Sequence, residues 1–292
     1  MLIVSTCSMF AQTATYKSGS VFWKISGKDL SKPSYLLGTL HFKPAEYLDS
    51  IPGARAALQS CEQAVGEILL SDMAGLQNQM MQAMMMPADT TYKMLYSDDD
   101  YRFVSEKIAS LTGGAGLEQF GRLKPAAIQL TVSVIAYMKY FPEINMSNTI
   151  DIYIQKEATN SQKPVLGLET IDDQIHAIFG ILNLKQQADA LLCSMKNSDK
   201  MIAFVPEVLN DYNAGDLNKL AQRFEENEIC PSTAAETDAL NKNRNEAWLK
   251  KLPEIMKNKS SFIAVGAIHL AGEDGLLNQL EKAGYKVEAV NF

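Results

Sequence analysis

Short apolar runs lie near both ends of the chain, whereas the middle follows a helical period. Runs bounded by Gly, Pro or Asp predict strands at residues 21–25, 34–38 and 64–70. A second group near the carboxyl end predicts a strand at 261–265, a helix at 275–283 and a strand at 285–290. The strands of the core are therefore expected from the two ends of the chain.

Between these ends, apolar positions recur every three or four residues, as in helices that bury one face. One buried strand, at 164–168, interrupts this region. Helices are expected at 73–86, 99–111, 124–140, 149–159, 172–179, 185–196, 200–213, 216–227 and 234–256. The sequence thus predicts an α/β (α+β) fold, with a central mixed sheet of N-terminal and C-terminal strands and a large helical insertion. No repeat or low-complexity linker divides residues 20–292, which are expected to form a single domain.

The first fourteen residues carry no charge, and Leu2-Ile3-Val4 leads into small residues. This pattern is typical of the apolar and cleavage regions of a secretory signal, so residues 1–15 are interpreted as a signal-peptide remnant. A frayed terminus or a first strand is the alternative. Cys7 follows a poor lipobox, which leaves a lipid anchor open. The protein is therefore expected to be secreted or periplasmic.

Composition narrows the function classes. The 292 residues carry a net charge of −7, which argues against a broadly basic surface for nucleic acid. No apolar stretch reaches the roughly 20 residues of a membrane span, so no transmembrane helix is expected in the mature chain. Four cysteines without a CxxC pair exclude a disulfide scaffold and a zinc ribbon. In an exported protein, Cys193 and Cys230 are the favoured pair, since they lie in neighbouring helical segments, and Cys61 is left as a core residue.

Two of the three histidines occupy the same sequence frame. His41 ends Gly38-Thr39-Leu40-His41, and His269 ends Gly266-Ala267-Ile268-His269, each directly after an apolar strand. Because ligands of α/β folds bind at the carboxyl ends of strands, both imidazoles are expected at one edge of the sheet. The alternative is that each histidine is a polar group satisfied at a strand end.

Two carboxylates lie in comparable places. Glu67 falls inside the expected strand 64–70, and Glu169 directly follows Val165-Leu166-Gly167-Leu168. A glutamate is rarely buried without a partner, so a metal, an arginine or a second carboxyl is expected beside each, unless that edge of the sheet is wet. Two His and two Glu side chains suit Zn²⁺, Mn²⁺ or Co²⁺ and the activation of a water molecule.

These motifs together resemble the TraB/GumN family. The resemblance rests on both Gly-x-x-His frames, the Glu67 strand, Gly167-Leu168-Glu169-Thr170 with Gln174, and Arg244-Asn245 in the last long helix. It covers residues 20–292 and extends distantly to the erythromycin esterase and ChaN-like group. For Tiki-like members it implies metal-dependent proteolysis. The family's Glu-Leu-Asp is Glu67-Ile68-Leu69 here, so one acid is missing.

The resemblance implies a role for each of these residues. His41, His269 and Glu169 would be metal ligands, and Glu67 or Glu169 would be the general base. Arg244 would orient a carboxylate or stabilise an oxyanion, and Asn245 would hold the substrate amide. Without the resemblance, a solvated helix face is the favoured interpretation of both residues. The chain is therefore interpreted as a metal-dependent hydrolase that acts on peptides or proteins. The alternative is a non-catalytic protein that binds a metal, haem or a peptide on the same scaffold.

Overall fold

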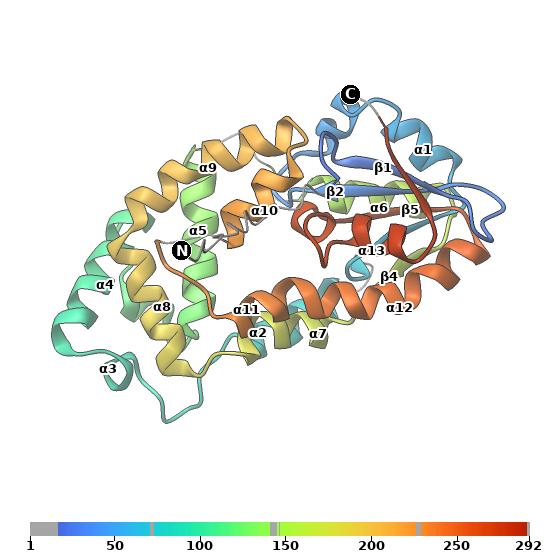
Figure 1. The fold of residues 1–292 in the computed structure, drawn as a ribbon. Helices are drawn as coiled ribbons and strands as arrows, with labels where there is room; N and C mark the ends of the chain where they lie inside the picture. Colours follow the sequence, from blue (N-terminus) through green and yellow to red (C-terminus); the bar gives the residue numbers. More distant parts are fainter. Residues whose placement is uncertain (1–16, 71–72, 141–144, 146, 226–228, 291–292) are drawn as a thin grey trace, which may run out of the picture.

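The structure is a computed structural model that describes residues 17–70, 73–140, 145, 147–225 and 229–290. The leader expected at residues 1–15, including Cys7, lies outside the described residues. Two parts lie side by side along the molecule, a sheet built from both chain ends and a group of helices from the middle (Figure 1). This arrangement confirms the expected α/β class.

The six-stranded sheet has the order β4-β3-β5-β2-β1-β6. Its strands are β1 (Phe22–Ser26), β2 (Ser34–Thr39), β3 (Gln63–Gly66), β4 (Val165–Gly167), β5 (Ser261–Gly266) and β6 (Lys286–Ala289). β1 runs antiparallel to both of its neighbours, whereas β4, β3, β5 and β2 are parallel to one another. The carboxyl ends of these four adjacent strands therefore meet at one edge of the sheet.

β3 is shorter than the sequence predicts. It ends at Gly66 rather than at residue 70, so Glu67 lies just beyond the strand and not inside it. The chain leaves the sheet here because residues 68 and 69 fold over Gly167, the last residue of β4. A Cβ on Gly167 would lie 2.9 Å from the backbone nitrogen of Leu69. The close passage of these backbones brings Glu67 to the open edge of the sheet.

Helices cover both faces of the sheet. On one face, α6 (Ile150–Asn160) lies against β3, since a Cβ on Gly66 would contact the Gln155 amide. On the other face, Gln63 donates a hydrogen bond to the backbone carbonyl of Ile255 in α12 (Asn243–Asn258). Glu67, just past the end of β3, also lies on this side, because its carboxylate accepts a hydrogen bond from Arg244 of α12.

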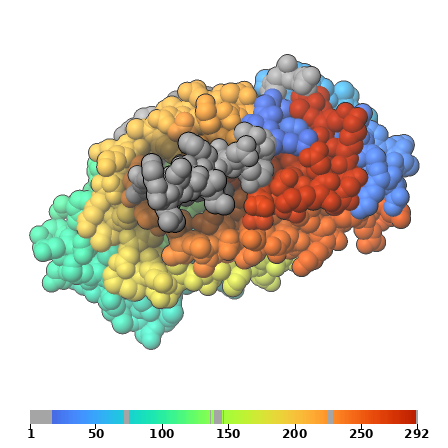
Figure 2. All heavy atoms as spheres, in the orientation of Figure 1, coloured from blue at the N-terminus to red at the C-terminus, as the bar shows by residue number. Residues whose placement is uncertain are grey.

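The helical part has an apolar core of its own, which includes Val104, Ile108, Ile128 and Leu191. It is built from α3 (Tyr92–Leu95), α4 (Asp98–Thr112), α5 (Pro125–Tyr140), α8 (Leu184–Lys196) and α9 (Ser198–Asn213). The remaining helices are α1 (Ala54–Ser60), α2 (Met73–Ala83), α7 (Ile171–Ile175), α10 (Leu217–Glu225), α11 (Ala234–Thr237) and α13 (Leu276–Lys282). Figure 2 shows the helical part, in green and yellow, extending away from the part that carries the C-terminal residues, drawn in red.

Two helices that the sequence predicts as continuous contain a π turn. Residues Asp238–Lys242 form one between α11 and α12, and His176–Gly180 form another after α7. The period of apolar positions cannot reveal such a turn, since it inserts only one residue into the repeat. The π turn at Asp238–Lys242 ends two residues before Arg244, and π turns are frequent at functional sites.

Cys193 of α8 and Cys230 form a disulfide, with 5.9 Å between their Cα atoms, which confirms the expected pair. Cys61 is free and buried, also as expected. None of the described helices is long and apolar enough to span a membrane.

The disulfide is expected to stabilise the fold by about 2–4 kcal/mol, because it closes a long loop in the unfolded chain. Reductant should therefore lower the urea midpoint of the wild type. The double variant Cys193→Ala/Cys230→Ala should start at that lower midpoint and not respond to reductant. Equal midpoints for the oxidised wild type and the double variant would contradict this contribution.

Candidate active site

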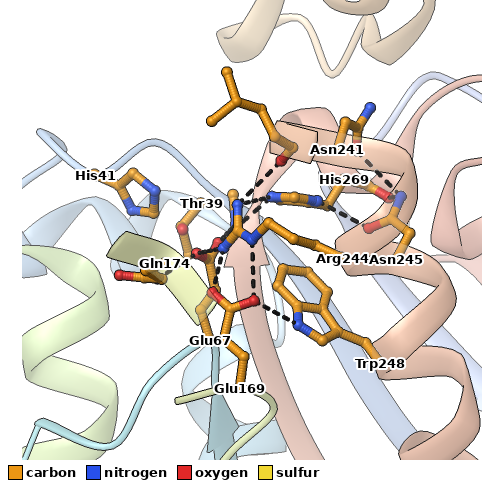
Figure 3. Close-up of polar contacts among 12 residues, drawn as sticks. Thr39, His41, Glu67, Glu169, Gln174, Asn241, Arg244, Asn245, Trp248 and His269 are labelled. Carbon is orange, nitrogen blue, oxygen red and sulfur yellow. Dashed lines mark hydrogen bonds and ion pairs between the residues drawn. The ribbon is translucent and has the colours of Figure 1, made fainter. Parts of the chain in front are cut away.

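The guanidinium of Arg244 lies between the two glutamates at the edge of the sheet (Figure 3). Its Nη2 donates to Glu67 Oε2 at 2.6 Å and to Glu169 Oε1 at 2.7 Å, and its Nε donates to Glu169 Oε2 at 3.0 Å. Arg244 Nη1 donates to the carbonyl of Leu240, in the π turn before α12, at 3.1 Å. Of the partners expected beside the two buried glutamates, the structure contains an arginine, which pairs with both.

Glu169 is enclosed by these contacts. Besides the two bonds from Arg244, its Oε2 accepts a hydrogen bond from the indole nitrogen of Trp248 at 3.0 Å. Its side chain is only 4% exposed. Both carboxylate oxygens are therefore bonded within the protein, and Glu169 braces the arginine rather than facing the solvent.

His269 is fixed in one tautomer by Asn245. The Asn245 amide nitrogen donates to the backbone carbonyls of His269 and Asp274, which leaves its oxygen to accept from His269 Nδ1 at 2.8 Å. His269 Nε2 then carries the lone pair, and it lies 3.0 Å from Arg244 Nη1. Burial, aided by the Arg244 charge, lowers the pKa of His269 to about 3, so the ring is neutral.

Asn245 thus stands behind His269 and is fully buried. Its side-chain amide makes its hydrogen bonds within the protein, to His269 and Asp274, and not to a substrate amide as the sequence predicts. It positions a histidine instead.

His41 is paired with Asp151 of α6. Its Nδ1 lies 3.2 Å from Asp151 Oδ2, and the other carboxylate oxygen accepts from Thr39 Oγ1 at 2.7 Å. Burial opposes protonation, but the hydrogen bond and the negative charge of Asp151 outweigh it and raise the pKa of His41 to about 9. The side chain is 60% exposed, so water weakens the cost of burial at this ring. His41 is therefore protonated at neutral pH.

His41, Glu67 and His269 meet around Gly266, the last residue of β5. A Cβ at this position would lie 3.4 Å from Glu67 Oε1, 3.5 Å from His41 Nε2 and 3.6 Å from His269 Cδ2. The structure thus brings both Gly-x-x-His histidines to one place. Glycine leaves the space in which these three side chains approach one another.

Glu67 is held as a carboxylate. Burial favours its neutral form, but the positive charges nearby and the backbone N–H of Gly266, 2.7 Å from Oε1, lower the pKa of Glu67. His269 is neutral above pH about 3, so the charges that act on Glu67 at neutral pH are those of Arg244 and His41. Glu67 Oε2 also accepts from Gln174 at 3.3 Å.

A pocket of about 250 Å³ opens beside this cluster. Its lining includes His41, Glu67, Asp151, Gln155 and Gln174, whereas Glu169, Arg244, Asn245 and His269 lie behind it. The sequence analysis missed Asp151, because an acid in the first turn of a helix is normally explained by the helix dipole. Only its pairing with His41, 110 residues away, reveals another role.

The set expected to bind a metal, His41, His269 and Glu169, does not fit one in this arrangement. Glu169 accepts three N–H bonds, and the free lone pair of His269 faces an N–H of Arg244. A metal ligand must offer its lone pair to the ion rather than to a cation of the protein. Within the described part of the chain, no group of three or more His, Cys, Asp or Glu side chains could hold a metal ion.

A family model agrees with this description of the chain. The model of the TraB/PrgY/gumN family matches residues 21–289, which include every side chain of the cluster. The chain belongs to the TraB/PrgY/gumN family. The expected family resemblance is therefore confirmed over nearly all of the described residues.

Curated relatives of this TraB/PrgY/gumN member carry the name of a protease. Metalloprotease TIKI2 of Danio rerio is 23% identical over 92% of the chain and 60% of its own length. Metalloprotease TIKI1 of Xenopus tropicalis is 24% identical over 87% of the chain and 59% of its own length. The chain thus spans about 60% of the length of these relatives. No solved structure matches the chain.

Replacing Arg244 by Met should destabilise the fold by about 3–5 kcal/mol at pH 8, because two buried carboxylates lose their counter-charge. In the wild type, the lowered pKa of Glu67 gives stability that is lost as the pH falls through it. In the variant, the pKa of Glu67 rises above its unfolded value, so the deficit should shrink between pH 8 and pH 5. Urea unfolding at both pH values measures this, and an equal deficit at both would contradict it.

The His41–Asp151 pair is expected to titrate well above a free imidazole. NMR of the His ring protons should place the pKa of His41 near 9 and show Asp151→Asn lowering it clearly, since the hydrogen bond and the charge of Asp151 are then lost. Because the folded pKa is the higher one, the pair stabilises the fold fully below pH 6.5 and loses this effect as the pH rises through about 9. A wild-type His41 that titrates near 6.5 would contradict the pairing.

Proposed function

We propose that the chain is a hydrolase that cleaves peptide bonds at the pocket of His41 and Glu67. The observation that carries the proposal is the meeting of an ionised Glu67 and a protonated His41 beside Gly266, at the mouth of a pocket. Base and acid of opposite charge on one side of a cleft are what water-mediated acyl hydrolysis requires. The names of the relatives, both metalloproteases, support a peptide bond as the target.

Each residue has a part in this proposal. Glu67 takes a proton from water, because it is the glutamate that lines the pocket, whereas Glu169 is enclosed. The His41 imidazolium donates a hydrogen bond to the carbonyl oxygen as charge develops there, and then a proton to the leaving amine. Arg244 and Glu169 position the Glu67 carboxylate. Asn245 and His269 complete the wall behind it.

Stimulation by a divalent metal, Mn²⁺, Co²⁺ or Zn²⁺, is part of the proposal on the strength of the relatives' names alone. His41 and Glu67 approach Gly266 with atoms that could bind a metal, whereas His269 approaches it with a ring carbon. Arg244 bonds Glu67 and faces the free ring nitrogen of His269. An ion would therefore have to compete with the Arg244 guanidinium, and no step above depends on it.

An exported location is also proposed. The Cys193–Cys230 disulfide supports it, since such bonds persist in oxidising compartments. A secreted or periplasmic hydrolase would meet peptides and proteins outside the cytosol.

The variants Glu67→Gln and His41→Ala are expected to lower kcat/KM about 10²–10⁴-fold, the usual effect of removing a general base or acid. Cleavage of a mixed peptide library, followed by mass spectrometry, provides the measurement. It should be run on chelated protein and after addition of Mn²⁺, Co²⁺ or Zn²⁺. His176→Ala is the matched control, since His176 is exposed and not among the lining residues.

The contrary outcome is that the wild-type protein binds library peptides and cuts none of them under any metal condition. That result would overturn the proposed hydrolase activity in favour of a peptide-binding function. Full activity in Glu67→Gln would reject this residue as the base. Circular dichroism of each variant separates these results from unfolding.

A further inference from the structure

A second pocket, of about 260 Å³, lies in the helical part. It is lined by residues of α4, α5, α8 and α9 and by Phe42. Its walls are mainly apolar, with Val132, Met201 and Ile202 among them. We call it the α5–α9 pocket. Its size is below that of sites for drug-sized ligands and suits one large side chain.

One polar atom in this pocket lacks a partner. Ser194 of α8 lines the α5–α9 pocket and is only 3% exposed, yet its hydroxyl makes no hydrogen bond in the described structure. By contrast, the hydroxyl of Ser198, which also lines the pocket, donates to Asp199. A buried hydroxyl without a partner destabilises the folded state. A bound group that reaches Ser194 would remove this cost.

The α5–α9 pocket adjoins the candidate active site through the backbone. Phe42 directly follows His41, so their Cα atoms are about 3.8 Å apart. His41 lines the first pocket and Phe42 the second, where its ring lies 4.4 Å from that of Tyr137. Consecutive residues of the chain thus border the two pockets.

We propose that the α5–α9 pocket binds a tyrosine side chain of the peptide substrate, next to the bond that is cut. The inference rests on the proposed function for the position of that bond. The apolar walls and the Phe42–Tyr137 pair accept the aromatic ring, and the phenol hydroxyl reaches Ser194. Tyrosine alone among the apolar-bodied side chains ends in a group that both donates and accepts a hydrogen bond.

The test uses pentapeptides that differ only in a central Tyr, Phe or Ala. Binding is measured by NMR titration to Glu67→Gln, in which the peptides stay intact, and kcat/KM is measured on the wild type. The Tyr peptide should bind about fivefold more tightly than the Phe peptide, as one net hydrogen bond gives. The Ala peptide should bind at least about tenfold more weakly than the Phe peptide, since an aromatic ring is left out of the pocket.

Two variants, Ser194→Ala and Ile202→Trp, test whether the tyrosine side chain binds in the α5–α9 pocket, and Ser133→Ala is their control. Ser194→Ala should abolish the difference between Tyr and Phe and leave Phe binding unchanged, whereas Ser133→Ala, an exposed hydroxyl on the same pocket, should keep it. Ser194→Ala should also leave the melting temperature unchanged or raise it, because it removes an unsatisfied group. Ile202→Trp, which fills the pocket, should weaken Tyr and Phe binding to the level of Ala.

Equal binding of the three peptides, or a Tyr preference that survives Ser194→Ala, would overturn the pocket assignment. These results are distinguishable from failure of the proposed function. Cleavage without side-chain preference would support the proposed hydrolase and reject tyrosine binding in the α5–α9 pocket. Selective binding of the Tyr peptide without cleavage would support tyrosine binding in the α5–α9 pocket and reject the proposed hydrolase.

Discussion

The charge of Arg244 is the constraint on which the candidate site depends. Two carboxylates, Glu67 and Glu169, are carried to the same edge by β3 and β4, and without a cation they would repel each other in a buried place. The guanidinium binds both and also faces His269, so its planar fork sets the relative positions of three side chains from three strands. A lysine, with a single ammonium group, could not make this set of contacts.

Much of this site follows from the sequence because parallel strands end together. The Gly-x-x-His frames and the two glutamates each follow an apolar run, and the sheet order places those four strands side by side. The fold class is predictable from apolar periodicity, which is a local feature, and the Cys193–Cys230 pair from an expected helix and the segment beside it, although Cys230 itself lies between α10 and α11 and not in a helix. The topology then adds only the order of the strands.

The partners of these residues were less predictable. The sequence leaves open whether Arg244 orients a carboxylate or stabilises an oxyanion, and it favours Glu169 as a metal ligand. Only the side-chain distances show that Arg244 and Glu169 bind each other. Asp151 looks like an ordinary helix-starting acid until His41 is placed beside it. The end of β3 was also misplaced, because the fold of residues 68 and 69 over Gly167 depends on a strand a hundred residues later.

Because of the π turn before α12, the geometry around Arg244 depends on the number of residues between α11 and α12. A π turn holds one residue more than the α-helix it interrupts, and here it presents the Leu240 carbonyl to Arg244. Loss of one residue between Asp238 and Lys242 would restore a continuous helix and turn α11 by about 100° relative to α12. Substitutions in this segment can keep its spacing, whereas a single deletion would carry the capped start of α11, at Thr233, around to another side of the molecule.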